Sequence, residues 1–342
     1  TGACYTYDAA SNAWQAVSGA GAQARMMMSL DATNDGRAVL FGGTTVATAA
    51  PNNQTWMITP TSATAATWTM RTPAVSPPAR GGHAHVALAD GRTMIFGGRA
   101  KAYMTTGCAV ARNQAGWMPC RLADTWIYDP NDGPQGSWKQ VTTPVAPSAR
   151  DFAMLAPYGR GAILFGGGVD DWYLGQPSTN DETWFFDPGT VDAAGNVVGA
   201  SWRLIDVAKP ADFTSMSHGS LTALGGGLFV QAAGYETPST CQHCQQYRVL
   251  DMAASPGPRW DEKITPPWGG RDYSQAWSVS PGTAVMFGGQ GNQNNEFSVW
   301  EFQLAGAVST PVACNNGLDD DGDGLVDTAD GGCAAWTATS EG

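Results

Sequence analysis

Short apolar runs, each closed by a glycine pair, recur along the chain. Four of these runs end in Phe-Gly-Gly, at Phe41, Phe96, Phe165 and Phe287, and a weaker fifth copy, LFVQAAG, occupies residues 228–234. Apolar runs of this length that are bounded by turn residues are typical of buried β-strands. The glycines supply the positive φ angles and the close backbone approach that the exit from such a strand needs. We therefore predict a strand before each glycine pair.

Further residues repeat in register with the glycine pairs. An arginine precedes the four phenylalanines by 15 or 16 residues, and a tryptophan precedes each arginine by 11 or 12 residues. The arginines are Arg25, Arg80, Arg150 and Arg271, and the tryptophans are Trp14, Trp68, Trp138 and Trp260. The weaker copy has Trp202 in register and Ser215 in place of the arginine. An aromatic segment follows each glycine pair, at residues 55–59, 125–129, 183–187, 247–251 and 299–303.

Each repeat is thus expected to form four strands. The first follows the arginine, the second ends in the glycines, the third is the aromatic segment and the fourth carries the tryptophan. This combination resembles the kelch repeat over residues 14 to about 304. The resemblance implies an all-β fold, a β-propeller built from four-stranded kelch blades.

The ends of the chain set the number of blades. The last repeat lacks a fourth strand, whereas a strand around Trp14 precedes the first repeat. Joining the two predicts five blades, closed by the N-terminal strand within a propeller domain of residues 1–308. Residues 4–8 (CYTYD) also look like a third strand, so they are either an added edge strand or part of a longer protein with more blades.

The tail, residues 309–342, contains an acidic loop with calcium-ligand spacing. Oxygen ligands at loop positions 1, 3, 5, 9 and 12 fall on Asp319, Asp321, Asp323, Asp327 and Asp330. The carbonyl of Leu325 takes position 7, and Gly324 occupies position 6, where a sharp turn is required. The loop resembles dockerin-type and thrombospondin type 3 loops, so calcium is the expected cofactor. The alternative is a solvated acidic linker.

Six of the seven cysteines fall into three local pairs, which indicates an oxidising compartment. The expected disulfides are Cys108–Cys120, Cys241–Cys244 and Cys314–Cys333, with Cys4 left over. Cys241 and Cys244 with His243 are also a candidate soft-metal site. We expect a secreted or cell-surface protein whose leader has been removed.

Composition and charge exclude some partners. The formal charge is −12, with six acids between residues 319 and 330, and such a chain lacks the basic face that nucleic acid requires. No apolar run reaches the 18 or more residues of a membrane span. Hydrophobic residues make up 43% of the chain, which favours a folded protein.

The candidate binding residues of the propeller are Arg25, Arg80, Arg150 and Arg271, because the resemblance places an arginine that opens a first strand at the channel mouth. The alternative is that these arginines bond backbone carbonyls between blades. Long insertions at residues 99–123, 168–181 and 235–246 are expected on one face, where they favour binding. His83 and His218 are assigned to the same position of two blades, as a metal site or as packed strand residues.

We therefore predict a calcium-stabilised extracellular binding or structural module, not an enzyme. Its partner is an unidentified protein or glycan, or another copy of the chain. The alternative is a secreted propeller enzyme, a galactose-oxidase-like oxidase or a hydrolase, acting at the channel mouth. The two His, two Tyr and Cys of such an oxidase cannot be placed in this sequence.

Overall fold

A computed structural model describes residues 4–8, 11–19, 21, 24–45, 50–101, 119–168, 179–237, 244–261, 263–266, 269–291 and 298–303. All regular elements within these ranges are β-strands, and five antiparallel sheets form the blades of a β-propeller, which confirms the predicted fold class. The chain divides into two compact units, each described here by itself. The first comprises residues 1–151 and 189–200, and the second comprises residues 152–188 and 201–342.

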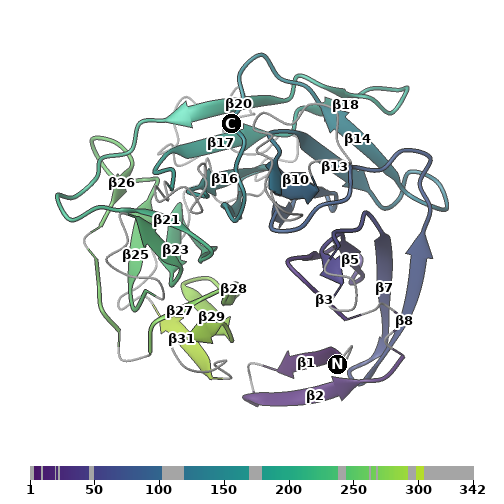
Figure 1. Cartoon of the computed structure of the whole chain (residues 1–342), viewed down its shortest axis with the longest axis horizontal. Coiled ribbons are helices and arrows are strands. Elements are labelled where there is room, and N and C mark those ends of the chain that lie inside the picture. Colours follow the sequence, from purple (N-terminus) through teal and green to yellow (C-terminus); the bar gives the residue numbers. More distant parts are fainter. Residues whose placement is uncertain are drawn as a thin grey trace, which may run out of the picture. The chain divides into compact units, whose positions relative to one another are not determined.

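The first unit contains blades 1 and 2 (Figure 1). Both blades are antiparallel, with the first strand of the blade at one edge and the strand that carries the tryptophan at the other. Blade 1 consists of β4 (Ser29–Ala32), β5 (Ala38–Phe41), β7 (Thr55–Ser62) and β8 (Ala65–Arg71). Blade 2 consists of β9 (Ala84–Ala87), β10 (Thr93–Phe96), β13 (Thr125–Asp129) and β14 (Ser137–Val141).

The second unit contains blades 3, 4 and 5, which repeat the same strand order. Blade 3 consists of β15 (Met154–Tyr158), β16 (Gly161–Phe165), β17 (Thr183–Asp187) and β20 (Ser201–Ile205). Blade 4 consists of β22 (Ser220–Gly225), β23 (Leu228–Ala232), β25 (Tyr247–Asp251) and β26 (Arg259–Trp260). Blade 5 consists of β28 (Gln275–Ser280), β29 (Thr283–Phe287) and β31 (Val299–Gln303). The predicted strands are therefore confirmed in all five repeats.

The N-terminal strand pairs with residues 4–8 within the first unit. β2 (Ala13–Val17) forms an antiparallel hairpin with β1 (Cys4–Asp8), in which Trp14 lies opposite Tyr7. Blade 5 has three strands among the described residues, and β31 pairs with β29. That β2 also completes the last blade as its fourth strand stays a prediction, because β2 lies in the first unit and blade 5 in the second.

Smaller two-stranded sheets accompany the blades, and two of them contain a repeat arginine, Arg25 or Arg271. In the first unit these are β3 (Arg25–Met26) with β6 (Thr44–Thr45), β11 (Arg99–Lys101) with β12 (Pro119–Arg121), and β18 (Thr190–Val191) with β19 (Val197–Val198). In the second unit they are β21 (Ser215–Ser217) with β24 (Tyr235–Thr237), and β27 (Arg271–Asp272) with β30 (Gln290–Gly291).

Within each unit the first strands of consecutive blades lie side by side: β4 contacts β9, β15 contacts β22, and β22 contacts β28. Aromatic and aliphatic side chains fill the space between blades. One core joins blades 1 and 2, and its members are Val39, Phe41, Met57, Ile95, Trp126, Tyr128 and Trp138. The largest core of the second unit gathers Ile163, Phe165, Phe229 and Trp260 from blades 3 and 4.

The glycine pairs bond the blades together. Each time, the second residue of the pair donates its N–H to the carbonyl at the arginine position of the next blade, over 2.9 Å. The four bonds are Gly43 to Arg80, Gly98 to Arg150, Gly167 to Met216, and Gly234 to Arg271. Gly98 has φ +89°, and a Cβ there would lie 2.8 Å from that of His83. Glycine is therefore required at this crossing of two chain segments.

Candidate functional site

Five blades share a residue in the left-handed backbone region, two positions after the arginine position. These residues are Met27 (φ 60°), Gly82 (φ 63°), Phe152 (φ 52°), His218 (φ 61°) and Tyr273 (φ 56°). Glycine adopts this conformation readily, whereas bulky residues do so at a cost of about 1–3 kcal/mol each. The strained backbone conformation therefore recurs at one position of the repeat.

Backbone hydrogen bonds hold these residues in place. In the first unit Gly82 donates its N–H to the carbonyl of Met27 over 2.9 Å. In the second unit His218 donates to Phe152 over 3.2 Å, and Tyr273 donates to His218 over 2.7 Å. The bonds run from blade to blade, so they bring together the side chains of consecutive blades.

In the second unit the result is a group of rings that we call the aromatic cluster: Phe152, His218, Tyr235 and Tyr273. The rings of Phe152 and His218 stack with centroids 3.8 Å apart. Tyr273 meets His218 edge-on at 4.9 Å and Phe152 at 5.5 Å. Tyr235, from β24, lies 6.3 Å from His218. Such edge-to-face and stacked geometries are the favoured ones for aromatic side chains.

The solvent exposure of the aromatic cluster increases from Phe152, which is buried, to Tyr273, which is exposed. Phe152 is 8% exposed, His218 and Tyr235 are half-buried, and Tyr273 is 39% exposed. The hydroxyl of the buried Ser217 lies 2.8 Å from Nδ1 of His218 and fixes the imidazole plane. A rigid aromatic surface of this kind can stack on a sugar ring or on a flat apolar side chain, and its phenol groups can hydrogen-bond.

The four repeat arginines do not form part of an exposed surface. Arg80, Arg150 and Arg271 are buried, and Arg25 is half-buried. In three blades the guanidinium donates to the carbonyl of the first glycine of its own pair: Arg25 to Gly42, Arg80 to Gly97 and Arg271 to Gly288, over 2.9–3.2 Å. Arg150 bonds the carbonyl and hydroxyl of Ser148.

For Arg80, Arg150 and Arg271, burial and these contacts contradict the prediction of ligand binding. A side chain with no exposed surface cannot reach a partner at the channel mouth, and its donors already have acceptors. The alternative interpretation is confirmed only in that Arg80, Arg150 and Arg271 bond backbone carbonyls, because the acceptors Gly97, Ser148 and Gly288 lie in the same repeat as the arginine and not in a neighbouring blade. Arg25 donates to Gly42, Asn52 and Gln54 but is only half-buried, so ligand binding by this residue stays a prediction.

The two histidines singled out from the sequence occupy different positions. The carbonyl that accepts from Gly167 belongs to Met216, so Met216 and not Ser215 takes the arginine position of blade 4. His218 is therefore equivalent to Gly82, one residue before His83. The assignment of both histidines to one repeat position was wrong by one residue.

His83 and His85 lie in the first unit: His85 is on β9, the strand that opens blade 2, and His83 directly precedes that strand. His83 is buried, its ring nitrogens make no hydrogen bond within the described residues, and burial lowers its pKa well below the usual value. Burial also acts to lower the pKa of His85, but the carboxylate of Asp31, 2.9 Å from Nδ1, more than offsets this and raises the pKa. Across the described ranges no three His, Cys, Asp or Glu side chains are grouped to hold a metal.

Most of the predicted disulfide and calcium residues lie outside the described residues. Cys120 and Cys244 are buried, whereas their predicted partners Cys108 and Cys241 are not described. The same is true of Cys314, Cys333 and the calcium ligands Asp319, Asp321, Asp323, Leu325, Asp327 and Asp330. The three disulfides and the calcium loop remain predictions.

No protein-family model matches the chain, and no curated protein matches it. Among the described residues there is no helix long and apolar enough to cross a membrane.

Sequence reasoning missed the aromatic cluster, although a signal for it was present. Phe152 and Tyr273 both stand two residues after a repeat arginine, and His218 stands two residues after Met216. The signal becomes visible only when the register of blade 4 is taken from the glycine pair. The shift by one residue hid the third member.

Proposed function

We propose that the protein is a secreted, calcium-stabilised binding module with kelch-type blades, and that its ligand contacts the aromatic cluster. One observation carries the proposal: three consecutive blades place Phe152, His218 and Tyr273 in a strained conformation at the same position, where their rings meet. Backbone strain that recurs at one site is retained where it serves function. Tyrosine at the edge of a rigid, partly buried cluster is a typical anchor for a partner.

The rings also indicate the chemistry of the ligand. The aromatic cluster carries no formal charge with His218 neutral, so it suits a flat apolar group more than an ion. Such groups are the C–H face of a sugar ring and the side chains of proline and aromatic residues. The partner is thus a glycan or a protein segment, including a segment of a second copy of this chain.

Substitution of Tyr273 by alanine is expected to weaken binding at least tenfold, because an anchor tyrosine contributes about 2 kcal/mol or more to an interface. The measurement is biolayer interferometry of the immobilised protein against soluble polysaccharides, proline-rich and aromatic peptides, and the protein itself. Tyr273→Phe is expected to retain most of the affinity, since it keeps the ring.

The matched control is Tyr5→Ala. Tyr5 is 56% exposed on β1, in the other unit, and does not belong to the aromatic cluster. Equal affinities of Tyr273→Ala and the wild type, or the absence of any binding partner in the panel, would contradict the proposed site.

The calcium part of the proposal rests on residues 314–333 and has its own test. Isothermal titration is expected to show one Ca²⁺ per chain, and the Asp321→Ala/Asp323→Ala double variant is expected to lose that binding. Calcium requires six or seven oxygen ligands, and this variant removes two of them. Asp181→Ala, which changes an exposed aspartate elsewhere, serves as the control.

Metal analysis of the purified protein separates the binding module from the alternative enzyme. Calcium without copper is expected. Stoichiometric copper would favour the oxidase, and a titration without calcium heat would remove the calcium-binding tail from the proposal.

A further inference from the structure

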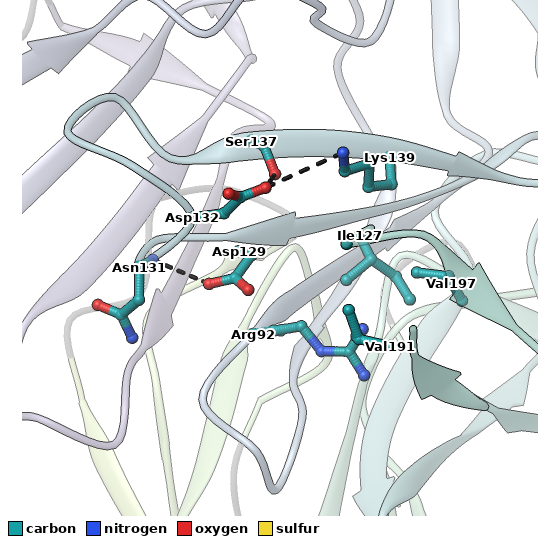
Figure 2. A pocket seen from close by; sticks show the side chains of 10 residues that line it. Arg92, Ile127, Asp129, Asn131, Asp132, Ser137, Lys139, Val191 and Val197 are labelled. Atoms are coloured by element: carbon teal, nitrogen blue, oxygen red, sulfur yellow. Dashed lines mark hydrogen bonds and ion pairs between the residues drawn. The ribbon is translucent and has the colours of Figure 1, made fainter. Parts of the chain in front are cut away.

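A small cavity lies at the outer part of blade 2, within the first unit (Figure 2). Its volume is about 220 Å³. Strands β13 and β14 and the turn between them contribute Ile127, Asp129, Asp132 and Lys139, and the turn before β10 contributes Arg92. The β18–β19 hairpin adds Val191 and Val197 as an apolar wall. Polar groups and aliphatic groups therefore face the same space.

The apolar wall comes from a segment that the repeat does not need. The hairpin of residues 189–200 connects the third and fourth strands of blade 3, whereas in blade 1 residues 63–64 suffice for that connection. Asp192 holds its turn, because one carboxylate oxygen accepts from the N–H groups of Ala194 and Asn196, over 2.9 and 2.8 Å. Val191 stays 49% exposed. The wall is thus shaped before any ligand arrives.

Arg92 has a donor left over. The residue is only 7% exposed, and its Nε and Nη2 bond Asp90 over 2.8 and 2.6 Å. Its Nη1 is buried and makes no hydrogen bond within the part of the chain that is described. A buried donor without an acceptor is costly, so an acceptor from a ligand would be favourable here. Nη1 carries two N–H groups, so Arg92 can still donate to an acceptor in the cavity.

The charges around the cavity balance. Arg92 and Lys139 carry two positive charges, and Asp129 and Asp132 carry two negative charges. Lys139 Nζ lies 3.9 Å from Asp132, beyond hydrogen-bond distance, and the carboxylate of Asp129 accepts the N–H of Asn131 over 2.8 Å. The two carboxylates disfavour an anion and the two cationic groups disfavour a metal ion. Donors and acceptors together suit hydroxyl groups, since a hydroxyl both donates and accepts.

We infer that this cavity binds one pyranose ring of a neutral sugar, either free or at the end of a glycan. The hydroxyl groups would bond Arg92, Lys139 and Asp129, and the C–H face would pack on Val191 and Val197. The volume suits a single ring, since it lies below the roughly 300–1,000 Å³ of sites for larger ligands. The inference goes beyond the proposed function, because none of these residues belongs to the aromatic cluster.

The test uses the full chain and methyl pyranosides of glucose, galactose, mannose and N-acetylglucosamine. Saturation-transfer NMR followed by titration is expected to show millimolar binding of at least one of them, as for a ligand of one ring (about −4 kcal/mol at 1 mM). Val191→Trp fills the cavity and is expected to weaken that binding at least tenfold. Lys139→Met is expected to weaken it severalfold. Both side chains are at least one third exposed, so the fold should survive these changes.

The matched control is Val198→Trp, which adds the same side chain to the same hairpin at an exposed residue that does not line the cavity. It is expected to bind as the wild type does. Binding must also persist in Tyr273→Ala, which separates this site from the aromatic cluster. The inference is overturned if no pyranoside saturates, if Val191→Trp binds unchanged, or if phosphate or glycine displaces the sugar, since those ligands would indicate an anion or zwitterion site.

Discussion

Replacement of Arg80 by alanine is expected to lower the free energy of unfolding by about 3–5 kcal/mol, the range for removing one partner of a buried ion pair. The Arg80 side chain has no exposed surface. It donates to both carboxylate oxygens of Asp124, over 2.6 and 2.7 Å, and to the carbonyl of Gly97 over 2.9 Å. Alanine would remove the ion-pair partner of the Asp124 carboxylate, which would keep only the indole N–H of Trp126, and the side-chain donor to the carbonyl of Gly97. Urea denaturation of the two proteins measures the difference.

The pKa of Asp124 gives the same prediction a pH dependence. Burial acts to raise this pKa, but the hydrogen bonds and charge of Arg80 outweigh burial, so the pKa is lowered. The ion pair therefore contributes its stability above the ordinary carboxyl pKa of about 3.9 and loses it as the pH falls through the lower value in the folded protein. Without Arg80, burial is opposed only by the hydrogen bonds from Trp126 and the backbone, so the stability that the Asp124 carboxylate contributes is expected to shrink.

Two further variants make the Arg80 prediction specific. Arg259→Ala removes an arginine whose side chain is 51% exposed, and it is expected to change stability by less than about 1 kcal/mol. The double variant Arg80→Met/Asp124→Leu is expected to be more stable than Arg80→Ala, because it leaves no unpaired charge. A loss below 1 kcal/mol for Arg80→Ala would show that the bonds from Arg80 to Asp124 and Gly97 do not stabilise the fold as their geometry indicates.

Replacement of Trp138 by alanine is expected to cost a similar amount, about 3–5 kcal/mol, because a large cavity would open between blades 1 and 2. Trp138 is 3% exposed and packs against Phe41 of blade 1 at 4.8 Å and Tyr128 of blade 2 at 5.0 Å. Its indole N–H donates to the hydroxyl of Thr55, in blade 1, over 3.0 Å. Trp138→Phe keeps the ring packing and should lose only about 1–2 kcal/mol, mostly from the hydrogen bond and the smaller ring.

The tryptophan of the N-terminal hairpin is the natural comparison. Trp14 is 39% exposed and contacts Tyr7 across the hairpin at 5.0 Å. Trp14→Ala should therefore destabilise the protein clearly less than Trp138→Ala. Equal losses would show that the burial of the two residues does not control their contribution. Both can be measured by urea denaturation under the conditions used for Arg80→Ala.

The strands of all five repeats could be predicted because their signals are local. Each predicted strand depends on residues within the strand and on the turn that ends it, as in the run before Gly97 and Gly98. The partner of a strand is not local. The sequence showed strand character in residues 4–8 and around Trp14, but only the pairing of Tyr7 with Trp14 decides that the two form a hairpin.

The candidate sites were harder to predict, for different physical reasons. An arginine has the same five donors whether it meets a ligand or a carbonyl, so the residue type of Arg80 could not decide between the two interpretations. The aromatic cluster depends on a backbone conformation that has no residue code, since Met27, Gly82 and Phe152 all adopt it. The cavity of blade 2 requires Val191, far along the chain, to pack near Lys139.

The left-handed position after each arginine has a consequence for how new specificities arise. Bonds between main-chain atoms, such as Tyr273 to His218, hold the turn, and the side chains at this position differ from blade to blade. The side chain at this position can thus be exchanged while the backbone of the blades stays the same. Single substitutions at this position can therefore change what the protein binds. Directed evolution of this protein would begin by randomising Phe152, His218 and Tyr273 together.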